Sequence, residues 1–218
     1  MSKSLPNLQY EKKLWQQGYL VIGLDEVGRG SLAGPLFVGA VCFKIPVDKN
    51  ERLKLQRIGI NDSKQLKPQQ RQKLVAFIQD NCFAATIASC PVSFINKKGI
   101  VQATQKAMRQ AIAMIQAKTH PHKLFVLVDA FEVKYVCKLG PGNQLAIITG
   151  DEKSLSIAAA SIIAKVARDK LMRSLSRQYP AYLWGRNKGY GTQKHIQAIK
   201  ANGPTSLHRN LFLRKILH

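Results

Sequence analysis

Four acidic side chains stand where short apolar segments of the chain end, and this position makes them the best candidates for chemistry. An ionised carboxylate beside a buried strand is unfavourable unless it is paired, hydrogen-bonded or bound to a cation. The chain contains only 12 Asp and Glu residues, so we do not expect this placement to recur by chance. Carboxylate oxygens are the ligands that Mg²⁺ and Mn²⁺ prefer, which predicts a site for a divalent cation. The predicted metal ligands and catalytic residues are Asp25, Glu26, Asp129 and Asp151.

The balance of charge indicates the substrate of such a site. The sequence has 34 Lys and Arg residues against 12 Asp and Glu residues, a net charge of +22. A field of this sign favours a polyanion, and nucleic acid is the first candidate. Together the acids and the basic exterior predict metal-assisted phosphodiester hydrolysis. In that reaction two ions roughly 3.5–4 Å apart activate the attacking water and stabilise the leaving oxygen.

A glycine-broken loop, Gly28, Arg29 and Gly30, follows the paired acids. Neighbouring side chains of a regular strand point to opposite faces, so we expect the chain to leave the strand at Asp25 and Glu26 if both serve one site. The glycines permit that departure and let backbone N–H groups approach a bulky group. With a guanidinium between them, the loop suits a phosphate or a sugar. A simple strand-end turn is the alternative.

The acids need a scaffold in which several strands end at one edge. Five short apolar segments are predicted to be strands, and five segments with helical spacing are predicted to be helices. Functional groups of open α/β sheets gather where strands end, so we predict an α/β fold. No internal repeat or low-complexity linker is visible, so we predict one domain, residues 1–218. The predicted strands are 20–24, 36–43, 83–89, 124–128 and 145–148, and the predicted helices are 8–17, 68–79, 96–118, 154–178 and 192–201.

Two further segments bring basic residues toward the site. Lys64 lies in a polar turn ahead of a helix, where its ammonium can bind a phosphate; a turn followed by a helix cap is the alternative. From about residue 180 to 218 aromatic residues alternate with cations, which suits base stacking and phosphate contacts. We expect this C-terminal helical and basic segment to contribute to substrate binding. Arg168 and Asp169 are predicted to be structural.

The cysteines and the apolar runs bear on the compartment. The four cysteines show neither a CxxC pair nor a metal-ligand spacing with histidine, which favours free thiols in a reducing cytoplasm. The sequence has no run of 18 or more apolar residues and no apolar segment behind its N-terminal lysine. We therefore expect neither a transmembrane helix nor a secretory signal, and predict a cytoplasmic monomer without membrane association.

Several segments, in the same order, resemble the type 2 ribonuclease H family, the bacterial ribonuclease HII proteins. The resemblance is most specific in residues 23–35, GLDEVGRGSLAGP, and covers almost the whole chain. It implies a ribonuclease H-like mixed central sheet of about five strands flanked by helices. It also implies an endoribonuclease that hydrolyses the RNA strand of RNA–DNA hybrids. The other matching segments are 61–66, 128–129, 150–151, 156–166, 168–169, 188–192, 195, 203–204 and 208–209.

The resemblance also implies roles for individual residues. The four acids match the metal ligands of the family, and the implied cofactor is Mg²⁺ or Mn²⁺. Gly28, Arg29 and Gly30 match the loop that recognises the ribose 2′-OH, through which a protein can tell RNA from DNA. Tyr190 matches the tyrosine that packs on the sugar next to the ribonucleotide. The implied reaction includes cleavage 5′ of single misincorporated ribonucleotides in duplex DNA, leaving 3′-hydroxyl and 5′-phosphate ends.

The chain departs from the family pattern at three positions. Ala130 stands where a glycine is usual, which predicts a tilt of the loop after Asp129, and Val27 and Ser31 replace the commoner alanine and proline. None of these changes removes a predicted catalytic group. One alternative is a basic nucleic-acid-binding protein without catalysis, in which the acids are caps and turn residues. Another is a metal-dependent nuclease that acts on all-DNA substrates.

Overall fold

A five-stranded sheet carries the predicted acids. The computed structural model describes residues 5–120, 122–140 and 142–217. The strand order is β3-β2-β1-β4-β5, in which β1 is antiparallel to β2 and parallel to β4, and β4 is parallel to β5. The carboxyl ends of β1, β4 and β5 therefore lie at one edge, as predicted. The strands are β1 (Leu20–Val27), β2 (Leu36–Phe43), β3 (Cys82–Cys90), β4 (Leu124–Asp129) and β5 (Gln144–Ile147).

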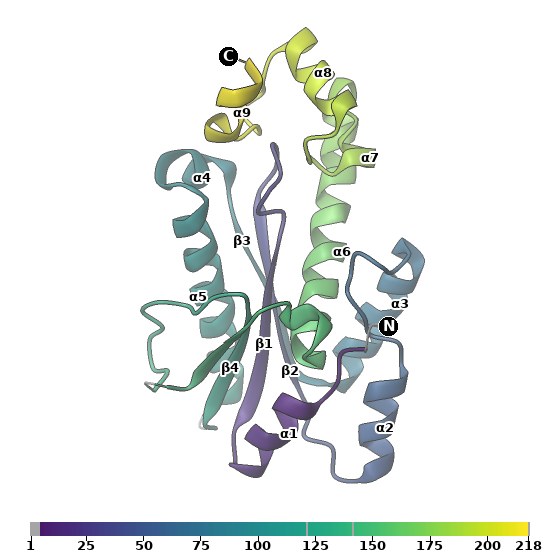
Figure 1. The fold of residues 1–218 in the computed structure, drawn as a ribbon, viewed down its shortest axis with the longest axis vertical. Helices are drawn as coiled ribbons and strands as arrows, with labels where there is room; N and C mark the ends of the chain where they lie inside the picture. Colours follow the sequence, from purple (N-terminus) through teal and green to yellow (C-terminus); the bar gives the residue numbers. More distant parts are fainter. Residues whose placement is uncertain (1–4, 121, 141, 218) are drawn as a thin grey trace.

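Helices cover both faces of this sheet (Figure 1). Helix α5 (Ile100–Thr119) packs on one face, and α6 (Leu155–Gln178) with α3 (Pro68–Asn81) packs on the other. The consecutive residues Val41 and Cys42 of β2 are both fully buried, one in the core beneath α6 and the other in the core beneath α5. Burial on both faces explains why the central strands are apolar throughout instead of alternating.

Helix α6 approaches the sheet closely because small residues face each other. A Cβ atom added at Gly23 of β1 would overlap the backbone of Ser156, and one added at Gly39 of β2 would overlap the carbonyl group of Ala160. The Ala and Ser residues at the start of α6 thus pack directly against the strand backbones. This close packing brings Ser161 of α6 near Asp25 in β1, where the serine lowers the pKa of the carboxyl group.

Most predicted elements are confirmed, and the differences lie among the helices. The predicted helix 96–118 is wrong at its start, because a separate helix ends at Lys98 and Gly99, with a φ of +83°, separates it from α5. The helix over residues 49–57 was not predicted, since it buries only Leu55 and lacks an apolar stripe. The helices over 184–187 and 210–217 were predicted only as parts of a helical C-terminal segment. The remaining elements are α1 (Gln9–Gln16), α2 (Lys49–Arg57), α4 (Val92–Lys98), η1 (Gly150–Glu152), η2 (Pro180–Tyr182), α7 (Trp184–Asn187), α8 (Gln193–Asn202) and α9 (Asn210–Leu217).

The C-terminal helices α7, α8 and α9 lie together at one end of the molecule, beyond β1 and β2 (Figure 1). Their chain is bonded to the loop that follows β1. The Gly34 N–H donates to the Leu207 carbonyl at 2.9 Å, and the Arg209 N–H donates to the Leu32 carbonyl at 2.8 Å. These bonds attach the basic C-terminal segment to the glycine loop.

The cysteines are free thiols, as predicted. Cys42 and Cys90 are buried, whereas Cys137 is exposed. Within the described residues, no helix combines the length and the apolar character needed to cross a membrane.

Candidate active site

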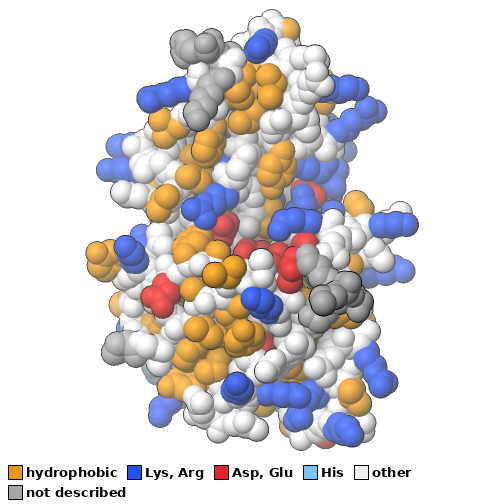
Figure 2. All heavy atoms as spheres, in the orientation of Figure 1, with side chains coloured by type: hydrophobic (Ala, Val, Ile, Leu, Met, Phe, Trp, Pro, Cys, Tyr) orange, Lys and Arg blue, Asp and Glu red, His pale blue; other side chains and the backbone are white. Residues whose placement is uncertain are grey.

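The four predicted acids lie at the carboxyl edge of the sheet. Asp25 and Glu26 belong to β1, Asp129 is the last residue of β4, and Asp151 lies in the short turn η1 after β5. The N–H of Gly150 donates to Asp129 Oδ1 at 2.6 Å, which attaches this turn to the end of β4. Figure 2 shows acidic side chains gathered near the middle of one face, with Lys and Arg side chains beside them.

The expectation that the chain leaves the strand at the paired acids is wrong. β1 continues through Val27, and Asp25 and Glu26 are paired in register with Gly39 and Val38 of β2. Since neighbouring side chains of a strand point to alternate faces, the two carboxyl groups extend from opposite faces of the sheet. Both groups nevertheless line one cavity at the end of the strand.

This cavity, of about 590 Å³, brings together most of the predicted site. Asp151 is the exception, because it is not part of the cavity wall. It nevertheless contacts Lys64, which lines the cavity. The cavity wall also contains four polar residues that were not predicted to belong to the site: Ser63, Arg71, Ser161 and Lys165. The predicted residues in the wall are Asp25, Glu26, Gly28, Arg29, Gly30, Lys64, Asp129 and Tyr190.

Asp25 is buried among like charges. Burial raises its pKa well above the usual range, and the charge of Glu26, followed by smaller effects of Asp129 and Asp151, raises it further, against a hydrogen bond from Ser161. The pKa of Glu26 is raised chiefly by burial, with Asp129 adding to the shift. Burial likewise raises the pKa of Asp129, and Asp151 adds to it. Asp25 is therefore repelled by the three other acids, and Asp129 is repelled by Glu26 and Asp151, which a bound cation would relieve.

The chemistry of these residues fits a divalent cation. Glu26 Oε2 is buried and has no hydrogen-bond partner in the structure. Such an orphaned oxygen is rare in folded proteins and points to a missing partner. Across the described residues, no three His, Cys, Asp or Glu side chains already form a group that could hold a metal ion. The donor set and its charge thus fit the ion, whereas a finished coordination shell is not present.

Lys64 neutralises part of the acid cluster. Its Nζ lies 3.4 Å from Asp151 Oδ2 and 4.0 Å from Asp62 Oδ1, and 78% of its side chain is exposed. Although burial lowers the pKa of Lys64, Asp151 and Asp62 raise it by more, so the net shift is upward. The ammonium is therefore charged at neutral pH and accessible to a phosphate.

The acid cluster should make the fold sensitive to pH and to metal ions. We expect the Asp25→Asn variant, in EDTA at pH 8, to unfold about 2–4 °C above the unsubstituted protein, the shift that 1 kcal/mol produces in a chain of this size. A carboxyl group whose pKa is raised by folding destabilises the fold at pH values above its folded pKa, and this loss disappears below its unfolded pKa of about 3.9. The difference in Tm should therefore narrow as the pH falls.

Differential scanning fluorimetry of both proteins between pH 5 and pH 8 measures this difference. Adding Mn²⁺ should raise the Tm of the unsubstituted protein, since a ligand that binds only the folded state stabilises it, and should have little effect on Asp25→Asn. Equal Tm values at pH 8 in EDTA, or equal stabilisation of both proteins by Mn²⁺, would contradict the proposed cluster.

The glycine loop is held from beneath by a buried arginine. Gly28 has a φ of +89°, and a Cβ atom there would overlap the Arg168 guanidinium, so both its conformation and its packing require glycine. A Cβ atom at Gly30 would meet nothing within 4 Å, so this part of the loop is open to a ligand. The Arg29 guanidinium lies 3.4 Å from Glu26 Oε1 and 4.9 Å from the centroid of the Phe131 ring.

Arg168 joins this loop to the C-terminal segment. It donates from Nη2 to Ser31 Oγ at 2.7 Å and to the Ala33 carbonyl at 3.1 Å. It also donates from Nε to the Pro35 carbonyl at 3.0 Å and from Nη1 to the Lys188 carbonyl at 2.9 Å. One guanidinium therefore fixes both the loop after β1 and the turn that precedes the predicted tyrosine.

A second fully buried arginine, Arg209, holds the two ends of the same loop. Its Nη1 donates to the Arg29 carbonyl at 2.9 Å, and its Nε and Nη2 donate to the Gly34 carbonyl at 3.0 and 2.8 Å. Burial, and secondly the charge of Arg168, lower the pKa of Arg209 to about 9. The half-buried Tyr190 ring lies 5.4 Å from the Arg168 Cζ, so Arg168 contributes positive charge beside this residue of the cavity wall.

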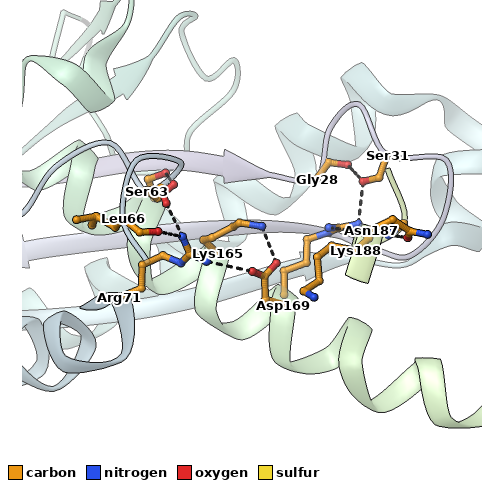
Figure 3. A network of polar contacts seen from close by, with 12 residues as sticks. Gly28, Ser31, Ser63, Leu66, Arg71, Lys165, Asp169, Asn187 and Lys188 are labelled. Atoms are coloured by element: carbon orange, nitrogen blue, oxygen red, sulfur yellow. Dashed lines mark hydrogen bonds and ion pairs between the residues drawn. The ribbon is translucent and has the colours of Figure 1, made fainter. Parts of the chain in front are cut away.

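Asp169 belongs to a different network from the four acids, in agreement with its predicted structural role. Its carboxylate lies 2.7 Å from Lys165 Nζ and 3.6 Å from Arg71 Nη2 (Figure 3). Arg71 also donates to the Ser63 carbonyl at 2.7 Å and thereby holds the segment that carries Lys64. The spacing of four residues from Ser161 to Lys165 to Asp169 along one side of α6 was the available signal for this polar face.

Ala130 adopts a strained backbone conformation. Its φ is +64°, in the left-handed region that glycine adopts freely, while its N–H still donates to the Ile147 carbonyl at 3.0 Å. We expect Ala130→Gly to stabilise the protein by about 0.5–1 kcal/mol, because relief of the Cβ clash exceeds the entropy that glycine adds to the unfolded chain. Urea denaturation measures this change, and a loss of stability would show that the conformation is not strained.

Comparison with known proteins identifies the class of this site. The family model for ribonuclease HII matches residues 22–215. The ribonuclease HII of Thermosynechococcus vestitus is 44% identical over 213 residues, which cover 97% of this chain and 92% of that protein. That of Caldanaerobacter subterraneus subsp. tengcongensis is 41% identical over 209 residues, 95% of this chain and 80% of that protein. The crystal structure of ribonuclease H2 from Pyrococcus horikoshii OT3 matches with a TM-score of 0.70 at 26% identity, covering 90% of this chain and 96% of that chain.

The fold and these matches define a hydrolase of the ribonuclease H type, with an RNase H-like sheet. The chain belongs to the ribonuclease HII family. It is accordingly an endoribonuclease that acts on RNA–DNA hybrids, and the alternative of a nucleic-acid-binding protein without catalysis is not supported.

Proposed function

We propose that this endoribonuclease also cleaves duplex DNA on the 5′ side of a single embedded ribonucleotide, leaving 3′-hydroxyl and 5′-phosphate ends. The observation that carries the proposal is the composition of one cavity wall. Carboxylates from β1 and β4, the Gly28, Arg29 and Gly30 loop, and the Tyr190 ring all line the same cavity. One nucleotide in this cavity could therefore contact both the carboxylates, which suit phosphodiester hydrolysis, and the loop and the Tyr190 ring, which suit ribose recognition.

Mg²⁺ or Mn²⁺ is the proposed cofactor, held by Asp25, Glu26, Asp129 and Asp151. Two such ions, when bound, supply activation of the attacking water and stabilisation of the leaving oxygen in an in-line displacement. The repulsion among these buried acids supports a cation here, because it disfavours their ionised forms when no cation is present. Lys64 is placed to bind a phosphate of the cleaved strand, since its exposed ammonium borders the same acids.

The loop residues have a separate proposed role, which is recognition of the ribose 2′-OH. Gly30 leaves the loop surface open, and Arg168 and Arg209 fix the loop through its carbonyl groups. A fixed loop can offer its backbone groups to a 2′-OH without losing conformational entropy on binding. Arg29, at the cavity wall, supplies positive charge for the adjoining phosphate.

We extend the proposal to the organisation and setting of the protein. Residues 1–218 act as one catalytic domain, and residues from about 180 to 218 contribute to substrate binding, supported by the place of Tyr190 in the cavity wall. The protein acts as a monomer in the cytoplasm, away from membranes, in the removal of ribonucleotides during DNA replication and repair. Free thiols at all four cysteines are consistent with a reducing compartment.

Substitution of Tyr190 tests the recognition part of this proposal. We define junction preference as kcat/KM for a duplex with one ribonucleotide, divided by kcat/KM for a uniform RNA–DNA hybrid. Tyr190→Ala should lower junction preference about tenfold, the effect of losing one stacked ring. Tyr190→Phe keeps the ring and should stay within about twofold of the unsubstituted protein, because only a hydroxyl group is lost. Unchanged junction preference in Tyr190→Ala would argue that the ring does not read the junction.

A further inference from the structure

Two buried histidines form a chain of hydrogen bonds that ends at Tyr190. His195 in α8 and His208 before α9 have no exposed surface, and their Nε2 atoms lie 3.3 Å apart. The fully buried Trp184 donates from Nε1 to His195 Nε2 at 3.0 Å. His195 Nδ1 lies 2.9 Å from the carbonyl oxygen of Tyr190. None of these three side chains lines the cavity.

The partners of the two rings determine where each proton lies. The indole N–H of Trp184 can only donate, so His195 Nε2 must accept and the proton of this ring is on Nδ1. His208 Nδ1 accepts from the backbone N–H of Thr205 at 2.9 Å, so the proton of this ring is on Nε2. His208 Nε2–H therefore points to His195 Nε2 at 3.3 Å and shares the one lone pair of that nitrogen with the Trp184 N–H, which lies closer at 3.0 Å. His195 Nδ1–H donates to the Tyr190 carbonyl.

Burial keeps both rings neutral. It lowers the pKa of His208 to about 4, with the neighbouring His195 as a secondary cause, and it also lowers the pKa of His195. A neutral ring with one fixed tautomer has one donor and one acceptor, so the direction of the chain cannot reverse without breaking a bond to Trp184 or Thr205. The Tyr190 carbonyl also accepts from the Thr192 N–H at 2.8 Å, and together these bonds fix its peptide plane.

We propose that His195 is a positioning residue for substrate recognition: through its Nδ1–H it fixes the backbone of Tyr190 and thereby the ring that packs on the sugar beside the ribonucleotide. Trp184 and His208 serve this role indirectly, since they hold His195 in the tautomer that can donate. The inference rests on the proposed function of Tyr190, because a displaced ring alters junction preference only if the ring reads the junction.

Two substitutions of His195 separate positioning from packing. In Asn the amide nitrogen is bonded to Cγ, as Nδ1 is in histidine, so His195→Asn keeps a donor for the Tyr190 carbonyl. In Gln the amide lies one atom further out and replaces Nε2, so His195→Gln keeps a partner for Trp184 and loses that donor. Tyr182→Phe is the matched control. It removes the 2.7 Å hydrogen bond from the Tyr182 hydroxyl to the Gly203 carbonyl, keeps the ring that packs on Trp184 and His208, and removes none of the hydrogen bonds that lead to Tyr190.

Junction preference and Tm are measured for all three variants beside Tyr190→Ala. We expect His195→Gln to lose about tenfold in junction preference, the upper range for one hydrogen bond, whereas His195→Asn and Tyr182→Phe stay within about twofold even where their Tm falls. Equal losses in His195→Asn and His195→Gln, or no loss in His195→Gln while Tyr190→Ala loses preference, would overturn the inference. Unchanged preference in Tyr190→Ala would instead overturn the proposed function of the tyrosine.

The tautomers give a second readout that does not depend on catalysis. Long-range ¹H–¹⁵N correlation spectra, assigned by the substitutions above, should show the Nδ1–H tautomer for His195 and the Nε2–H tautomer for His208 at pH 7. The opposite tautomer at His195 would remove the donor on which the inference depends and would contradict it even if activity changed.

Discussion

Replacing Asp25 by Asn is expected to lower the rate of RNA–DNA hybrid cleavage by about a thousandfold, the upper range for loss of one group that stabilises transition-state charge. The side chain is 5% exposed and interacts electrostatically with the three other acids, so its carboxylate is central to the proposed cation site. Asparagine has the same shape but carries no charge, and it is a weaker ligand for a hard cation. Single-turnover cleavage of a labelled hybrid in Mg²⁺ or Mn²⁺ measures the effect.

Asp80→Asn is the matched control, because it removes the same charge from an exposed position on α3. It should cleave at the rate of the unsubstituted protein. Binding of the hybrid in EDTA should be unchanged or slightly tighter in Asp25→Asn, since a negative charge is lost from a basic protein. Cleavage by Asp25→Asn within a few-fold of the unsubstituted rate would show that this carboxylate is not part of the chemistry.

Replacing Arg168 by Met is expected to destabilise the protein by about 3 kcal/mol or more, because several buried acceptors lose their donor together. The fully buried guanidinium bonds to the loop after β1 and to the Lys188 carbonyl. Arg168→Lys should recover little of the loss, since one ammonium cannot reproduce the planar fork of donors. Urea denaturation at pH 7 measures the free energy of unfolding of each variant.

Arg177→Met provides the control on the same helix. Arg177 is exposed in the last turn of α6, so its replacement should change the free energy of unfolding by no more than about 0.5 kcal/mol. If Arg168→Met lost less than about 1 kcal/mol, the bonds of Arg168 could not be what holds the loop, since each orphaned buried acceptor alone is worth about that much.

The sequence allowed the acid cluster to be predicted because its signal is local. Each acid follows an apolar segment, and parallel strands bring their carboxyl ends to one edge whatever the details of packing. The detailed path of β1 was mispredicted for the opposite reason. Pairing with β2 extends the strand through Val27, and the apolar run 20–24 alone does not reveal that pairing.

The support for the site was harder to predict than the site itself. Arg168 and Arg209 are charged residues, which usually lie at the surface, and their complete burial depends on carbonyl groups from distant segments. The same holds for the pair His195 and His208, whose contacts join two C-terminal helical segments. The break between α4 and α5 depends on one residue, Gly99, whose conformation overrides the helical spacing around it.

Cleavage of a labelled DNA duplex that contains one ribonucleotide tests the central claim most directly. The assay is run with Mg²⁺, with Mn²⁺ and with EDTA, beside an all-DNA duplex of the same sequence. We predict a single cut 5′ of the ribonucleotide, with a 3′-hydroxyl and a 5′-phosphate, in either metal and none in EDTA or in the all-DNA duplex. Cutting of the all-DNA duplex, or an intact ribonucleotide duplex in both metals while an RNA–DNA hybrid is cleaved, would contradict the proposed recognition of a single ribonucleotide.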